Sequence, residues 1–266
     1  KQMSKTKHSE NIKHHYDKEG FYLFRNFFDA SEIETLKKII LKFHHLWKSE
    51  NAEFYREVAF NSSLITGSKH LSTSERLVLF NFISSRKLME IINHIIPNKP
   101  AFMNSQLFFN PINPELKDFW HRDCQYDHEI EMQKKVIQET QVVHFRIPLF
   151  DEPGMEIIPG SHRRWDTEEE LAIREELNGR KSNEDIAAGK KIRLSAGDLL
   201  VFSADMIHRG IYGLDRLAWD ILVFDSSGDF VDYVDDDCLP SLPMITEIEE
   251  PSIFKNTIAL KSSIKT

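Results

Sequence analysis

From residue 101 onward the chain is divided into short apolar segments, and this division constrains the fold more than any other feature. Gly, Pro, Asp and Ser separate the segments, a pattern typical of strands joined by turns. The expected strands are 101–110, 141–150, 155–158, 191–194, 198–202 and 217–224. Many short strands at irregular spacing favour an antiparallel sandwich or jelly roll. We therefore predict a β core with helices packed outside it.

The first hundred residues are predicted to be mostly helical. Residues 21–24 form an expected short strand, and Asp29 or Ser31 can cap the helix that follows. Apolar residues then recur at spacings of three and four, which indicates an amphipathic helix. A second helix is expected over 73–96.

Three further segments complete the expected architecture. Residues 129–138 resemble a short polar helix, 167–189 a charged, helix-prone excursion over the surface, and the tail after Val231 is acidic and then irregular. We expect one domain over 1–266. Its expected parts are a helical N-terminal part, a β core and a C-terminal tail: 1–99, 100–226 and 227–266.

Charge and cysteine content exclude several classes of protein. A net charge of −8 argues against a general nucleic-acid binder, which needs a basic face. Two cysteines do not make a disulfide framework in a chain of this size, so we expect a reducing, cytoplasmic compartment. We find no signal peptide and no apolar run of membrane-spanning length, so we expect no membrane partner. The oligomeric state stays open.

His121 and Asp123 lie two residues apart, directly after two aromatic residues. On an extended strand, residues i and i+2 point to the same side, so these side chains can share a metal, a proton or only solvent. His208 follows the 198–202 strand. Two histidines and one carboxylate leave one face of an octahedral ion open, as in non-haem Fe(II) oxygen chemistry. The helical H-E-x-x-H motif of zinc hydrolases is absent.

The segment GMEIIPGSH at 154–162 resembles a motif of the phytanoyl-CoA dioxygenase family. The order of HxD, PGSH, GDLLVF, His and Arg along the chain is also that family's order. The opening segment YDKEGFYLFRNFFDASEIETLK is similar to the family's usual beginning. The resemblance covers roughly residues 15–226.

This resemblance implies an oxygenase that uses Fe(II), 2-oxoglutarate and O₂, built on a double-stranded β-helix, the cupin-like jelly roll. It implies that the catalytic iron ligands are His121, Asp123 and His208. It also implies that Arg216 pairs with the distal carboxylate of 2-oxoglutarate, which suits a guanidinium fork. Where the family often has Ser or Thr, this chain has Gly210, and Tyr212 is a candidate to supply the hydroxyl instead.

Other polar residues on the expected strands are candidates for the same cavity. His144 and Arg146 share one side of their expected strand, opposite an apolar side. The resemblance implies that one side of this strand turns toward the metal cavity, so we predict that His144 and Arg146 bind an anionic substrate, with 2-oxoglutarate as the alternative partner of Arg146. The alternative is that this face of the strand meets solvent. Gln106 is a candidate for the C1 end of 2-oxoglutarate, and the alternative is an amide that is hydrogen-bonded within the sheet.

The predicted function is hydroxylation of an unactivated C–H bond in a small polar or anionic metabolite, with release of succinate and CO₂. Three alternatives stay open at this point: an acyl-CoA hydroxylase, a non-catalytic jelly-roll binding protein, and a zinc or manganese hydrolase on a cupin-like barrel. Asp123 argues against halogenation, because related halogenases have a small residue at that position.

Overall fold

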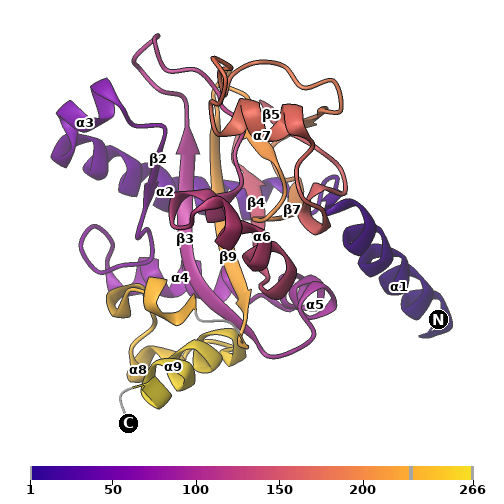
Figure 1. Ribbon diagram of the computed structural model, residues 1–266. Helices are drawn as coiled ribbons and strands as arrows, with labels where there is room; N and C mark the ends of the chain where they lie inside the picture. Colours follow the sequence, from indigo (N-terminus) through magenta and orange to yellow (C-terminus); the bar gives the residue numbers. More distant parts are fainter. Residues whose placement is uncertain (1, 228–229, 265–266) are drawn as a thin grey trace.

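The computed structural model describes residues 2–227 and 230–264, with side chains from Glu10 onward (Figure 1). Its strands form two antiparallel sheets in this part of the chain: a six-stranded sheet, β1-β7-β4-β9-β3-β2, and a three-stranded sheet, β6-β5-β8. The strands are β1 Phe21–Phe24, β2 Asn61–Ser63, β3 Pro100–Phe109, β4 Val142–Pro148, β5 Glu152–Ile157, β6 Lys190–Leu194, β7 Leu199–Ser203, β8 His208–Gly210 and β9 Leu217–Asp225. The predicted antiparallel β core is confirmed, although β2 and β8 were not predicted.

Helices flank the sheets, as the sequence predicted. They are α1 Gln2–Glu19, α2 Ala30–Glu50, α3 Ala52–Glu57, α4 Thr73–Ile83, α5 Arg86–Ile95, α6 Ile130–Glu139, α7 Glu168–Arg174, α8 Leu242–Ile245 and α9 Ser252–Ile264. Asp29 is the N-cap of α2, and its side chain accepts a hydrogen bond from the Glu32 N–H. This cap is one of the two that we proposed.

The single helix expected over 73–96 is wrong, because α4 ends and α5 begins at a pair of serines. Ser84 leaves helical geometry, and its hydroxyl donates a hydrogen bond to the Phe80 carbonyl. Ser85 then serves as the N-cap residue of α5. A serine side chain that bonds the backbone locally competes with helix propagation, which explains the break.

The helical excursion expected over 167–189 is also largely wrong, since only α7 is helical there. The prediction of an irregular C-terminal tail is wrong as well, because α9 forms a helix of 13 residues that packs on β3. Thr257 on α9 donates a hydrogen bond of 2.6 Å to the Phe102 carbonyl. Figure 1 shows α9 (yellow) beside the lower ends of β3 and β9. The packing of α9, rather than a strong local pattern, accounts for this helix.

Two clusters of buried apolar side chains determine where a site can form. The larger cluster joins α2, α4, α5 and α9 to one face of the six-stranded sheet. The second lies between the two sheets, with Phe202 and Leu200 from β7 against Met155 and Ile157 from β5. In the described residues, no helix combines the length and apolar character needed to cross a bilayer.

Candidate metal centre

Two backbone hydrogen bonds hold His121 and His208 side by side next to the core between the sheets. The His121 N–H donates to the His208 carbonyl and the His208 N–H donates to the His121 carbonyl, both at 3.0 Å. The imidazole centroids are consequently 4.3 Å apart. Phe202 borders them, with its ring centroid 5.2 Å from that of His208. Residues 87 positions apart therefore form one rigid pair.

Asp123 completes the group from the first residue of a short 3-10 helix, Asp123–Tyr126. Arg122 is extended, so His121 and Asp123 point to the same side, as the spacing predicted. Asp123 Oδ1 lies 3.4 Å from Nε2 of His121 and 3.4 Å from Nε2 of His208. One ligand atom from each of the three residues lies within 4.8 Å of the other two, so the group can hold a metal ion.

The hydrogen bonds of the two imidazoles suit them to metal binding. Nδ1 of His121 lies 3.1 Å from the Phe119 carbonyl, and Nδ1 of His208 lies 2.8 Å from the Met206 carbonyl. A carbonyl only accepts, so each Nδ1 carries the proton and each Nε2 presents its lone pair to the site. Burial lowers the pKa of His208 to about 4, which keeps this ring neutral. The donor set of two imidazoles and one carboxylate fits Fe(II).

A chain of buried ions extends from Asp123 into the six-stranded sheet. The second oxygen of Asp123, Oδ2, accepts a hydrogen bond of 2.7 Å from Nε2 of His144. Nδ1 of His144 donates to Asp220 at 2.9 Å, and Arg146 binds both oxygens of Asp220 at 2.6 and 2.8 Å. Burial opposes the charge on His144, but Asp123 and Asp220 raise its pKa to about 9. Although burial opposes its charge, the charge of His144 and the hydrogen bond that His144 donates hold the pKa of Asp123 well below its usual value.

Cross-strand register produces this chain of ions. His144 and Arg146 alternate on β4, and Arg146 is directly opposite Asp220 on β9. The structure therefore directs both predicted residues to the site rather than to solvent, and both line its cavity. Their predicted role in substrate binding stays a prediction. Within the described chain, Nη1 of Arg146 is buried without a hydrogen-bond partner.

Arg216 lies in the same cavity with its guanidinium against Gly210. Nη1 of Arg216 donates to the carbonyls of Gly154 and Ile211 at 3.0 and 2.9 Å, whereas Nε is buried with no partner in the described residues. A Cβ atom at position 210 would lie 2.4 Å from Nη2 of Arg216. Gly210, which departs from the family pattern, is therefore what makes room for this position of the arginine.

The two remaining predicted residues also line the cavity. Gln106 is half-buried on β3, and Tyr212 lies with its ring 5.8 Å from the Arg216 guanidinium carbon. Sequence reasoning missed Glu152, which is fully buried 3.9 Å from Arg216. Burial raises the pKa of Glu152, and neither of its carboxylate oxygens has a hydrogen-bond partner in the described chain.

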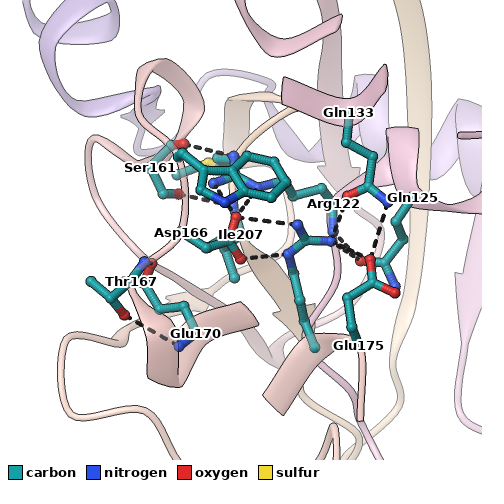
Figure 2. Close-up of polar contacts among 12 residues, drawn as sticks. Arg122, Gln125, Gln133, Ser161, Asp166, Thr167, Glu170, Glu175 and Ile207 are labelled. Atoms are coloured by element: carbon teal, nitrogen blue, oxygen red, sulfur yellow. Dashed lines mark hydrogen bonds and ion pairs between the residues drawn. The ribbon is translucent and has the colours of Figure 1, made fainter. Parts of the chain in front are cut away.

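Arg122, between the two predicted ligands, clamps the loops that carry them (Figure 2). Its buried guanidinium donates to the carbonyls of Ser161 and Asp205 at 2.7 and 2.5 Å. The hydroxyl of Ser161 accepts a hydrogen bond of 2.8 Å from the Ile207 N–H. The PGSH turn is thereby tied both to the segment that bears Asp123 and to the segment that precedes His208.

Asp166 neutralises this clamp. Its Oδ1 accepts hydrogen bonds from Nε and Nη2 of Arg122 at 3.1 and 3.0 Å, and its Oδ2 accepts one of 2.6 Å from Arg174. All three side chains are fully buried. In Figure 2, Gln125, Gln133 and Glu175 surround the same group. Arg174 donates to each of them.

Two of the residues that sequence reasoning missed carried a recognisable signal. Asp220 is a lone charge within the apolar segment LAWDILVF, and Arg122 stands between two predicted ligands. A charge in either position requires a buried partner. Asp166 and Glu152 carried no such signal, because each lies in a segment that resembles an ordinary polar loop.

Comparisons with known proteins give the context of this geometry. A sequence model described as phytanoyl-CoA dioxygenase (PhyH) matches residues 16–211. The chain belongs to the phytanoyl-CoA dioxygenase family. Arg216 lies just beyond the matched residues. A comparison with curated proteins returned no match.

Solved structures of low sequence identity share the fold. EctD from S. alaskensis, with 2-oxoglutarate and 5-hydroxyectoine, superimposes with a TM-score of 0.57 at 15% identity, over 82% of this chain and 76% of its own. AviO1 from Streptomyces viridochromogenes Tue57 gives 0.55 at 17% identity, over 82% and 95%. The alpha-ketoglutarate-dependent carbocyclase SnoK from nogalamycin biosynthesis gives 0.55 at 14%, over 82% and 84%. The cupin jelly roll is confirmed, and the family supports an iron- and 2-oxoglutarate-dependent oxygenase.

Proposed function

We propose that this protein is an Fe(II)- and 2-oxoglutarate-dependent oxygenase that hydroxylates an unactivated C–H bond of a small molecule, releasing succinate and CO₂. The observation that carries the proposal is the convergence of three ligand atoms, from His121, Asp123 and His208, within 4.8 Å of one another. Iron(II), when bound, supplies the activation of dioxygen. The chain's own task is to hold the reactants in place and to keep water from them.

Each of the three residues has a defined part in holding iron. The histidines offer neutral Nε2 atoms because backbone carbonyls hold the protons on Nδ1. Asp123 offers Oδ1, since His144 already donates a hydrogen bond to Oδ2. We assign His144 to positioning: it restricts Asp123 to one ligand atom, as partners of metal-bound carboxylates do.

Arg216 is our proposed partner for the distal carboxylate of 2-oxoglutarate. A buried guanidinium with an unpaired Nε in the cavity provides charge-assisted hydrogen bonds for a carboxylate. Gln106 and Tyr212 line the same cavity, so we retain them as candidates for the C1 end of 2-oxoglutarate and for a hydroxyl partner of its distal end. The cavity volume is about 590 Å³, within the range of pockets for small molecules.

The proposed role of Arg146 follows from its ion pair with Asp220. This bidentate pair is fully buried, so it satisfies the charge of Arg146 before any substrate arrives. We therefore assign Arg146 to holding Asp220, and through it His144, in place. A substrate anion would have only the buried Nη1 of this residue to bind.

Anaerobic titration of the protein with Fe(II) and 2-oxoglutarate tests the proposal. We expect the visible charge-transfer band of an Fe(II)–2-oxoglutarate chelate and, on admission of air, conversion of 2-oxoglutarate to succinate. His208→Ala should lose both, and Arg216→Ala should raise the 2-oxoglutarate concentration required. His45→Ala, an exposed change on α2, is the matched control. Normal behaviour of both site variants, or no band in the unmodified protein, would refute the assignment.

A further inference from the structure

Aromatic rings form a continuous wall of the cavity that begins at the metal site. The Phe60 and Phe119 ring centroids are 5.5 Å apart, and Phe119 lies 5.1 Å from His121. On the other side of His121, the Tyr126 ring centroid lies at 5.7 Å. Phe60, Phe119 and Tyr126 all line the cavity. This wall offers a substrate apolar contact and the negative faces of aromatic rings.

The positive charges in the cavity are already committed. Arg146 is paired with Asp220, and His144 donates to two carboxylates. Arg216 is reserved, under the proposed function, for 2-oxoglutarate. None of the three is free to neutralise an anionic substrate.

Asp205 is the buried carboxylate of the cavity that has no partner. It lines the cavity with only 6% of its surface exposed, and its carboxylate makes no ion pair or hydrogen bond with any residue that the structure describes. Its backbone is fixed, because its N–H donates to the Ser203 hydroxyl and its carbonyl accepts from Arg122. The backbone that bears this carboxylate is therefore held in place, three residues before His208.

Ionising a buried carboxylate without a partner is costly, so burial and the charge of Asp123 raise the pKa of Asp205 to about 7. A cation that enters the cavity would stabilise the ionised form of Asp205. Asp127, at the exposed mouth, also lines the cavity and adds a second negative charge. A carboxylate on the substrate would instead lie in a cavity with Asp205, and none of the three cations would be free to pair with it. The same cavity thus holds a carboxylate without a partner and an aromatic wall.

We propose that the substrate is a protonated amine with an apolar body, whose ammonium group pairs with Asp205 while its hydrocarbon part packs on Phe60, Phe119 and Tyr126. This inference rests on the proposed function, since it reserves Arg216 for 2-oxoglutarate. Asp205 is thereby a specificity-determining residue: it selects an amine over an alcohol or an acid of the same shape.

Three probes of nearly equal size test the proposal: 2-phenylethylamine, 2-phenylethanol and phenylacetate. Each is titrated by calorimetry into the anaerobic protein loaded with Fe(II) and 2-oxoglutarate. We expect the amine to bind at least about tenfold more tightly than the other two, as a charge-assisted hydrogen bond implies. Phenylacetate binding as tightly as the amine, equal affinity for all three, or no measurable binding of the amine would overturn the proposal.

Asp205→Asn provides the second arm, because it keeps the shape of the side chain and removes its charge. We expect this variant to bind the amine about tenfold more weakly and the alcohol unchanged. Asp151→Asn, an exposed change outside the cavity, is the matched control. An unaltered amine affinity in Asp205→Asn would contradict the inference. The charge-transfer band, recorded in the same samples, separates the two proposals: its absence refutes the oxygenase, whereas its presence without amine selectivity refutes only the substrate class.

Discussion

Asp166 is the carboxylate shared by two buried arginines, Arg122 of the clamp and Arg174, so replacing it by Asn tests the clamp directly. The side chains of Asp166, Arg122 and Arg174 are fully buried, and Asp166 bonds both arginines through distances of 2.6–3.1 Å. Asn keeps the shape of the side chain but removes the charge. Arg122 then loses its carboxylate partner, whereas Arg174 keeps Glu175 at 2.8 Å.

The magnitude follows from the burial of the ion pair. Removing one partner of a buried pair costs about 3–5 kcal/mol, and no discount for solvent screening applies when the side chains are fully buried. An unfolding entropy of about 2.1 cal/mol/K per residue gives about 0.56 kcal/mol/K for the 266 residues. We therefore expect Asp166→Asn to lower Tm by about 5–9 °C.

Thermal unfolding followed by circular dichroism measures this shift, with Glu169→Gln as the control. Glu169 on α7 is exposed and pairs with Arg180 at 3.5 Å, so its loss should change stability by less than about 1 kcal/mol. Because Arg122 also ties the loops of the ligands together, Asp166→Asn should weaken binding of Co(II), used as a probe of the metal site, by about tenfold or more. A Tm within about 2 °C of the unmodified protein, at about 2 °C per kcal/mol, would refute the reasoning.

Three further predictions concern the cavity, the C-terminal helix and acid stability. Gly210→Ser places a Cβ only 2.4 Å from Nη2 of Arg216, which forces the guanidinium to move, so we expect 2-oxoglutarate to bind about tenfold more weakly by calorimetry, and an unchanged affinity would count against the position of the arginine. Thr257→Val removes the hydrogen bond to the Phe102 carbonyl and should lower the urea-derived free energy of unfolding by about 1 kcal/mol, whereas no change would show that α9 does not depend on it. Burial lowers the pKa of His162 from 6.5 to about 4, so the unfolded chain binds the proton first and stability should fall as pH drops from 6.5 to 4, by about 3 kcal/mol for this group. His162→Gln should flatten that pH dependence of urea unfolding, and an equally steep loss would contradict the assignment.

The sequence by itself determined the features that depend on local chemistry. The spacing of His121 and Asp123 placed both side chains on one side, and this follows from the geometry of an extended residue between them. Asp29 was recognisable as a helix cap because its function depends on a backbone N–H only three residues away. The short strands were recognisable because turn residues separate them. In each case the interacting groups are close in the chain, and residue type is sufficient to identify them.

Only the tertiary structure decided which distant charges meet. Arg146 was expected to face a substrate, yet the register of β4 on β9 places it opposite Asp220. In the same way, Arg122 pairs with Asp166, and α9 packs on β3, only when the whole chain is folded. A buried charge must be paired, but the residues next to it in the sequence do not identify its partner. Strand register and loop packing bring that partner from a distant part of the chain. The nature of the ligand residues was therefore readable from the chain, whereas the ions that hold them in place were decided by the fold.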